Sequence, residues 1–276
     1  MMTQDDAPTM PERPDRTWSE LLAACHDGRM AQWAEAAGTP VAADLSGLSP
    51  KEAAQSLWHR YAPLARPVGQ GVRVIAQLGQ SLDGRIATPT GHSHYVTGPA
   101  DRAHLHRLRT LSEAVLVGAG TVMADDPRLT VREVTGPQPI RVVSAGRAGI
   151  DPQRAIFRDG MTPTWAVAPA AVSMPAVDRR IHPADMTPAS ILAALAEAGI
   201  RRLLVEGGAK TVSAWLAAGL VDHLYLTVSP VIIGSGPTGL QLPAISHMDE
   251  AWRPPTEQFA LGEDRLYRLD FTGASG

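Results

Sequence analysis

Hydrophobic positions follow two different patterns along the chain, and the change comes near residue 70. Before it, apolar residues recur at helical spacing, as in Trp18, Leu21 and Leu22. After it, short apolar runs bounded by glycine and polar residues alternate with helical stretches. Such alternation is typical of a mostly parallel sheet with helices on both faces. The pattern predicts an α/β domain over residues 71–276 that follows a small N-terminal helical extension.

The first seventy residues divide into a tail and a helical segment. Residues 1–16 are rich in proline, aspartate and threonine and predict a disordered tail. Residues 17–70 predict three helices. The first begins with a capping box of Thr17 and Glu20, and the second is an Ala-rich run around Trp33. The third has Ser49 as its N-cap before Pro50 and is ended by Pro63 and Pro67. We interpret this segment as packing over an edge of the main domain or a subunit interface. Recognition of a partner is the alternative.

The α/β domain should contain a twisted, mostly parallel sheet with an antiparallel C-terminal edge. We expect strands at 73–78, 114–117, 129–131, 140–144, 164–167, 201–205, 223–229 and 266–271. We expect helices at 100–111, 189–198 and from about 209 to 219, the last of which is amphipathic.

Composition narrows the class of protein. The chain has 276 residues and a formal net charge of −3, which argues against a general binder of nucleic acid or membrane surfaces. Cys25 is the only cysteine, which excludes an internal disulfide and a multi-cysteine zinc site. The start is polar and acidic, and no apolar run is long enough to span a bilayer, so we expect a cytoplasmic protein.

The strand predicted at 114–117 is followed by residues that can bind a ligand. Gly118 and Gly120 come directly after it, and glycines there expose backbone N–H groups. Two acids, Asp125 and Asp126, follow. A dinucleotide-binding Rossmann fingerprint is rejected because Met123 occupies the third glycine position. A solvated turn remains the alternative for the two acids alone.

A second stretch of this kind follows the strand predicted at 201–205. Glu206 stands at its carboxyl end, and Gly207 and Gly208 join it to a helix. Glycines at the start of a helix present unpaired N–H groups to anions. The alternative is a tight turn without a ligand. On the helix predicted at 100–111, His104 and His106 should point in different directions, so we expect no metal site.

These stretches carry the motifs of a known family in one order. The motifs are 81–87 (SLDGRIA), the 91–98 loop, 108–109 (LR), 117–118 with 120–122, 124–127 (ADDP), 129–132 (LTVR), 205–208 (VEGG) and 219–222 (GLVD) before Pro230 and 233–234. Over residues 72–272 the chain resembles the pyrimidine reductase domain of riboflavin biosynthesis, which has a dihydrofolate-reductase-like fold. Bifunctional members also carry a zinc deaminase domain, whose Pro-Cys-x-x-Cys motif this chain lacks.

The resemblance implies a cofactor and a reaction. The family uses NADPH to reduce the ribosylamino group of a diaminopyrimidine ribose 5-phosphate to ribitylamino, with hydride transfer to C1′. The implied substrate residues are Ser93, Arg109, Leu129, Arg132 and Glu206, with Arg109 and Arg132 as a phosphate clamp. The implied cofactor residues are Gly79, Tyr95, Thr121, Asp125, Ser144, Gly208, Ala209, Lys210 and Thr211. Asp125 is the first candidate for polarising or protonating the reacting imine, and Glu206 is the second. The family also implies a homodimer.

Two residues depart from the pattern of the family. Gln77 stands in the first strand where the family usually has lysine, and Tyr95 stands where it usually has tryptophan. The loss of a cation at Gln77 leaves open a reductase of the same fold that acts on another pyrimidine- or pterin-like substrate. A further alternative is a non-catalytic module that binds a ligand or a partner.

Overall fold

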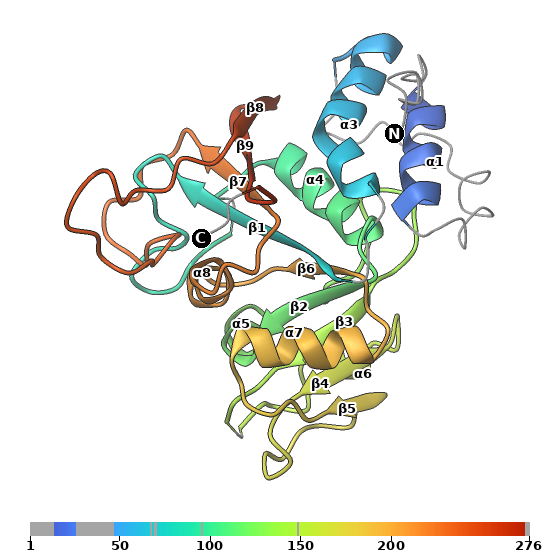
Figure 1. The fold of residues 1–276 in the computed structure, drawn as a ribbon, viewed down its shortest axis with the longest axis vertical. Coiled ribbons are helices and arrows are strands. Elements are labelled where there is room, and N and C mark those ends of the chain that lie inside the picture. Colours follow the sequence, from blue (N-terminus) through green and yellow to red (C-terminus); the bar gives the residue numbers. More distant parts are fainter. Residues whose placement is uncertain are drawn as a thin grey trace.

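The centre of the protein is a single twisted sheet of nine strands among the described residues (Figure 1). The structure is a computed structural model that describes residues 14–25, 47–66, 68, 71–94, 96–147 and 149–273. The strand order is β5-β4-β3-β2-β6-β1-β7-β9-β8. The strands are β1 (Arg73–Ser81), β2 (Ala114–Gly118), β3 (Ile140–Ser144), β4 (Thr164–Val167), β5 (Arg179–Ile181), β6 (Arg202–Val205), β7 (His223–Ser229), β8 (Thr256–Leu261) and β9 (Asp264–Asp270).

The strands from β5 to β7 pair in parallel, and β9 pairs antiparallel with both β7 and β8. This arrangement confirms the predicted mostly parallel sheet with an antiparallel C-terminal edge. The sequence missed β5 and β8, because β5 has only three residues and four of the six residues of β8 are exposed. Neither strand shows the apolar run that marks a buried one.

Helices cover both faces of the sheet, as predicted. They are α1 (Pro14–Cys25), α3 (Pro50–Ala65), α4 (Pro99–Thr110), α5 (Ala119–Asp125), α6 (Ala155–Arg158), α7 (Pro188–Glu197) and α8 (Ala209–Ala217). Alternate residues of β2 face opposite sides. Val115 and Val117 join the core under α4, whereas Ala114 and Leu116 join the core under α7 and α8.

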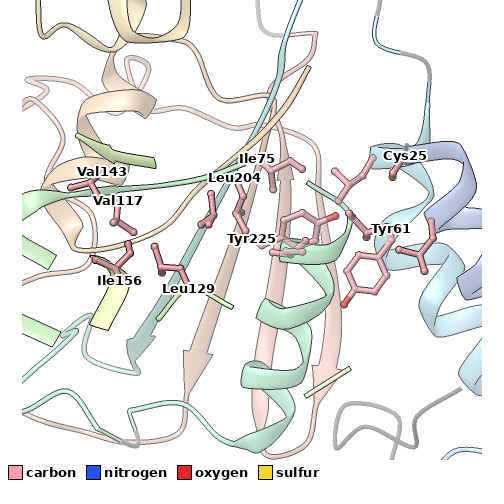
Figure 2. Close-up of a cluster of buried hydrophobic side chains, with 14 of the residues drawn as sticks. Cys25, Tyr61, Ile75, Val117, Leu129, Val143, Ile156, Leu204 and Tyr225 are labelled. Carbon is pink, nitrogen blue, oxygen red and sulfur yellow. The ribbon is translucent and has the colours of Figure 1, made fainter. Parts of the chain in front are cut away.

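The N-terminal extension belongs to the same hydrophobic core as the α/β domain. Trp18 and Tyr61 are fully buried in the cluster that also contains Ile75 and Tyr225 of the sheet. Figure 2 shows this cluster running from Cys25 and Tyr61 across the sheet to Val117 and Leu129. The Tyr61 hydroxyl lies 2.7 Å from His104 Nδ1 on α4. The extension therefore packs against the helix that carries Arg109. The boundary predicted at residue 70 remains a prediction.

The C-terminal ends of α1 and α3 accept hydrogen bonds from arginine side chains of the sheet. Arg73 on β1 donates to the carbonyl oxygens of Leu64 and Arg66 at 3.1 and 2.6 Å. Arg202 on β6 donates to the carbonyls of Leu64 and Cys25. Helix C-termini carry partial negative charge and unpaired carbonyls, so these cations satisfy both.

Two predictions in the extension were wrong. The first helix begins at Pro14, so residues 14–16 are not part of a tail and Thr17 lies inside the helix, not at its cap. Pro63 lies inside α3 and does not end it. Proline has no N–H to bond the carbonyl of His59, four residues earlier, and the side chain of Arg268 donates to that carbonyl instead. The capping box of Ser49 is confirmed, with Glu52 as its partner. The predictions for residues 1–13 and for the helix around Trp33 lie outside the described residues.

Candidate functional site

Several implied site residues, Ser144 and Glu206 among them, lie at or next to the carboxyl ends of four neighbouring strands. Ser144 ends β3, Gly118 ends β2, Glu206 follows β6, and Ser81 ends β1. These strands are adjacent in the order β3-β2-β6-β1. Ligands of open parallel sheets bind at this edge, because the loops there leave a crevice. Residues far apart in the chain thus share one site.

Arg109 and Glu206 form a buried ion pair. The Nε and one Nη nitrogen of Arg109 donate to the two carboxylate oxygens of Glu206, each at 2.8 Å. The other Nη donates to the carbonyl of Thr130 at 2.9 Å. Both side chains are less than a tenth exposed. The sequence indicated both residues as site residues. It did not show that the carboxylate of Glu206 occupies the two guanidinium nitrogens of Arg109 that would otherwise bind a phosphate.

Residues 129–131 form a loop, so the strand predicted there is wrong. Leu129 has a φ of +54°. Val131 pairs with the side chain of Gln138, not with a strand, through its N–H at 2.7 Å and its carbonyl at 2.9 Å. The side chain of Gln138 therefore makes the two hydrogen bonds that a neighbouring strand would have made with the backbone of Val131. The sequence could not show this, because Gln138 is separated from Val131 by a loop.

Arg132 is the exposed cation of this loop. The His106 ring holds its backbone, with Nδ1 accepting the N–H groups of Arg132 and Glu133 at 2.7 and 3.1 Å. The Arg132 side chain donates to Thr130 Oγ1 at 2.6 Å. Partial burial, then the positive charges of Arg109 and Arg128, lower the pKa of the Arg132 guanidinium. An anion placed among these arginines would relieve that repulsion.

The two adjacent acids have different surroundings. Asp126 is the C-cap of α5 in the left-handed conformation, with a φ of +44°, and its Oδ1 accepts the Ala155 N–H at 2.7 Å. Asp125 is the last residue of α5. Burial raises the pKa of the Asp125 carboxyl, and the charge of His94 opposes the rise. The surroundings of Asp125 therefore favour its protonated form.

The implied cofactor residues on α5 and α8 are in contact. Thr121 Oγ1 accepts the N–H of Gly208 at 3.0 Å. Gly207 has a φ of +116°, and a Cβ there would lie 3.0 Å from Thr121 Oγ1. A Cβ on Gly118 would lie 2.8 Å from Thr211 Oγ1. The glycines allow the two turns to pack this closely. Of the next two residues, Ala209 is buried and Lys210 is exposed.

A cleft of about 430 Å³ opens beside this contact. It is lined by Ala119, Gly120, Met123, Ser144, Gly146, Arg147, Gly149 and Ile150. Arg147 is an exposed cation that the sequence reasoning missed, since a single arginine in a glycine-rich loop gives no signal. A larger cavity of about 850 Å³ lies between the C-terminal end of α8 and residues 252–255, and none of the implied site residues lines it.

The remaining implied residues lie on β1 and the loop that follows it. Gly79 is a β1 residue against which Thr97 packs, so that a Cβ there would lie 2.9 Å from Thr97 Cγ2. Ser93 is half-buried. Gln77 is buried, with its Nε2 3.5 Å from Asp101 Oδ1. Tyr95 lies outside the described residues.

His104 and His106 point to different partners, as predicted, the first to Tyr61 and the second to the backbone of Arg132. Within the described residues, no three His, Cys, Asp or Glu side chains gather in a way that could hold a metal ion. Nor does any helix in these residues combine the length and apolar character needed to cross a membrane.

Comparisons with known proteins identify the family of the chain. The chain matches the RibD C-terminal domain over residues 72–255. It is 33% identical to the 2,5-diamino-6-ribosylamino-4(3H)-pyrimidinone 5′-phosphate reductase of Methanothermobacter thermautotrophicus, over 72% of this chain and 98% of that protein. It is 34% identical to the riboflavin biosynthesis protein RibD of Bacillus amyloliquefaciens, over 58% of this chain and 46% of that protein. The chain thus spans about half the length of that RibD relative.

Solved structures show the same fold. RibD of Acinetobacter baumannii superposes with a TM-score of 0.63 and 26% identity, covering 80% of this chain and 63% of that one. A deaminase/reductase from Thermotoga maritima superposes with a TM-score of 0.65 and 25% identity, covering 80% and 62%. The family match, the full-length relative and the shared arrangement of the sheet agree, and the chain belongs to the RibD C-terminal domain family.

Proposed function

We propose that the protein is the NADPH-dependent reductase of a diaminopyrimidine ribosylamino 5′-phosphate, which it converts to the ribitylamino compound. The observation that carries the proposal is the match to a pyrimidinone 5′-phosphate reductase over nearly its whole length. The pairing of Arg109 with Glu206 beside Arg132, at the carboxyl edge of the sheet, supports it with a charged site of suitable chemistry.

The turns at α5 and α8 would hold NADPH, which supplies the hydride. The start of α8 suits the phosphates of a dinucleotide, because the first N–H groups of a helix favour anions and Gly207 carries no side chain that would keep a ligand away. Thr121 fixes the Gly208 turn, and Ser144 lines the neighbouring cleft. We add Arg147 to the implied residues, as a cation for a phosphate of the cofactor.

Arg132 would bind the substrate phosphate. Its exposed guanidinium lies among other positive charges, while Arg109 is already paired with Glu206. We therefore revise the implied clamp. Arg132 contacts the phosphate, and the Arg109–Glu206 pair supplies a fixed polar wall, from which Glu206 oxygens accept hydrogen bonds from ribose hydroxyls. Ser93 and Leu129 complete this side of the site.

Asp125 would move the proton. Reduction of the opened imine at C1′ adds a hydride to carbon and a proton to nitrogen, so an acid must stand close to that nitrogen. Burial raises the pKa of Asp125 towards the value such an acid needs. Glu206 is less suited to the role, since Arg109 pairs with both of its oxygens.

One observation favours a second candidate substrate. Gln77 places a neutral amide beside the buried carboxyl of Asp101, at a strand position where the family usually has a cation. A substrate with a different pyrimidine or pterin ring, and no need for that cation, is the second candidate. The variant Gln77→Lys separates the two, because a gain of turnover with the phosphorylated substrate would show that the missing cation had limited it.

We further propose that the protein is a homodimer. Five large hydrophobic side chains between residues 232 and 252 are more than a third exposed, namely Ile232, Leu242, Ile245, Met248 and Trp252. Leu82 is also exposed and donates its N–H to Val231 at the start of this segment. A concentration of exposed apolar residues is typical of a subunit interface. Light scattering of the wild type and of Ile232→Asp tests this, and a dimer unaffected by the charge would place the interface elsewhere.

The decisive experiment combines an assay with a titration. Loss of NADPH absorbance is followed with the diaminopyrimidine ribosylamino 5′-phosphate, and NADPH binding is titrated separately. We expect both turnover and binding. Tight binding of NADPH without turnover would contradict the proposed substrate and favour the second candidate. An absence of NADPH binding would contradict reductase activity altogether and favour a non-catalytic module.

A further inference from the structure

The loop between β1 and α4 is fixed at both ends by hydrogen bonds, and the side chains of Thr88, Asp101 and Asp264 that make them lie outside the family motifs. At its start, Thr88 closes a turn with His92, through a backbone bond of 3.0 Å and a bond from the His92 N–H to Thr88 Oγ1 of 3.2 Å. At its end, Thr97 and Gly98 are held by two carboxyl groups. Between these ends lies Ser93, a proposed substrate residue.

The two carboxyl groups come from elements that are distant in the chain. Asp101, in the first turn of α4, accepts from Thr97 Oγ1 at 2.7 Å. Asp264, the first residue of β9, accepts the N–H of Gly98 at 2.8 Å. Asp101 and Asp264 are 4% and 3% exposed. Buried acceptors of this kind hold their donors firmly, because a broken bond would leave a buried polar group unpaired.

Thr97 is also packed against the backbone of β1. Its methyl group occupies the space that a side chain at Gly79 would need, since a Cβ there would lie 2.9 Å from Thr97 Cγ2 and 3.5 Å from Asp101 Oδ2. This contact gives Gly79 a reason to be glycine that is independent of any cofactor. Thr97 is therefore fixed by a hydrogen bond on one side and by close packing on the other.

We propose that Thr97, held by Asp101 and seated on Gly79, is a positioning residue that sets the place of the 91–98 loop and so of Ser93 in the substrate site. The effect on turnover rests on the proposed function, whereas the effect on the loop does not. His94 is carried by the same loop, and its charge acts on Asp125, so the loop also lies within electrostatic reach of the proposed acid.

The chain offers a matched control. Asp101 accepts a second hydroxyl, from Thr227 on β7, at 2.6 Å. Thr97→Val and Thr227→Val each remove one hydroxyl from the same carboxyl at nearly constant volume. Only the first removes a bond to the loop. A third variant, Thr97→Ser, keeps the hydroxyl and loses the methyl contact with Gly79.

Two measurements test the proposal. Hydrogen–deuterium exchange of the peptide that contains residues 91–98 reports on the loop without any assay, and steady-state kinetics report on the site. We expect Thr97→Val to speed exchange in this peptide and to lower kcat/KM for the phosphorylated substrate between about tenfold and a hundredfold, as small displacements of a binding group do. Thr227→Val should lower the melting temperature comparably and leave both readouts near wild type. Thr97→Ser should restore most of kcat/KM.

Equal effects of Thr97→Val and Thr227→Val on exchange and on kcat/KM would overturn the proposal, since they would reveal only a loss of stability. Unchanged exchange in Thr97→Val would overturn it as well. If the wild type turns over no phosphorylated pyrimidine while Thr97→Val still frees the loop selectively, the proposed function fails and the role of Thr97 in holding the loop stands.

Discussion

His106 organises the segment that carries Arg132. Its ring accepts two successive backbone N–H groups at one nitrogen, which requires that nitrogen to be unprotonated. Burial, and then the charges of Arg109, Arg132 and Arg102, lower the pKa of His106 to about 3. The neutral ring is thus a structural acceptor, and one of the arginines that help to keep it neutral is Arg132, which we assign to the substrate phosphate.

This depressed pKa predicts a loss of stability in acid. The unfolded chain takes up a proton at His106 near pH ~6.5, whereas the folded protein does so only near pH 3. The contribution of His106 is therefore complete above pH ~6.5, and it falls by about 1.4 kcal/mol per pH unit as the pH drops towards 3. Urea denaturation across this range measures it. His106→Asn, which keeps an acceptor and cannot be protonated, should show a shallower dependence. Parallel curves for the two proteins would contradict the assignment.

Asp125→Asn should abolish proton donation, while its amide oxygen can still accept a hydrogen bond from the cofactor. Because general acids contribute roughly 10²–10⁴-fold, we expect kcat to fall by at least about a hundredfold, with NADPH affinity nearly unchanged. In the wild type the raised pKa of Asp125 means that the acid form is lost as the pH rises, so kcat should decline on the alkaline side of that pKa. Asp126→Asn is the control, and it should cost stability more than turnover. A variant of Asp125 with wild-type kcat would remove it from the mechanism.

Arg132→Ala should weaken binding of the phosphorylated substrate far more than binding of NADPH. The lost charge-assisted contact is worth about 2 kcal/mol, which corresponds to roughly a 30-fold rise in KM. Arg179→Ala removes the same charge at the distant strand β5 and should leave KM unchanged. If NADPH affinity falls and KM holds, the phosphate of the substrate binds elsewhere.

At the scale of elements, the turn from β6 into α8 depends on its contact with α5. Gly207 and Gly199 both have positive φ values, of +116° and +97°. A Cβ on Gly207 would meet Thr121, whereas one on Gly199 would meet nothing within 4 Å. The first glycine is therefore needed for conformation and for contact, and the second for conformation alone.

This difference predicts distinct results for two alanine variants. Both Gly207→Ala and Gly199→Ala should lower the free energy of unfolding by about 1–3 kcal/mol, because both place a side chain in a strained conformation. Only Gly207→Ala should also weaken NADPH, by roughly fivefold or more, through the loss of a hydrogen bond worth about 1 kcal/mol at Thr121. Denaturation and an NADPH titration separate the two effects. Equal NADPH affinities for both variants would show that this turn does not bind the cofactor.

At the scale of the whole molecule, the N-terminal helices are part of the domain and not an attached module. Trp18 donates from Nε1 to the carbonyl of Thr135 at 3.2 Å, and the Arg107 guanidinium lies 4.8 Å from the centre of its ring. Tyr225, in the sheet, donates its hydroxyl to the carbonyl of Arg60 on α3 at 2.6 Å. The extension and the sheet should therefore unfold together.

Trp18→Ala tests this unity. Removing a fully buried tryptophan should lower the free energy of unfolding by about 3–5 kcal/mol. The whole protein should show one transition, which far-UV circular dichroism and tryptophan fluorescence report alike. Met161→Ala is the control, since that side chain is 58% exposed, lies outside the proposed dimer interface, and its loss should cost much less. Two separate transitions would show that the extension folds on its own.

The sequence by itself determined the elements and the family. Apolar runs placed the parallel strands of the central sheet, because strands buried on both faces read as continuous hydrophobic segments. The strand before Glu206 placed that carboxylate at the edge of the sheet where ligands bind, because open parallel sheets bind ligands beyond the carboxyl ends of their strands. Ser49 marked the start of α3, because a cap is a local interaction.

Only the tertiary structure decided which groups are paired and which are free. Glu206 neutralises Arg109 across 97 residues of sequence, Arg268 takes the carbonyl that Pro63 leaves unpaired, and Gln138 replaces a strand partner for Val131. Each is a hydrogen bond between segments that no periodicity connects. Local propensity sets where helices and strands can form, but a buried polar group without a partner costs free energy, and which partner it finds is decided by the fold.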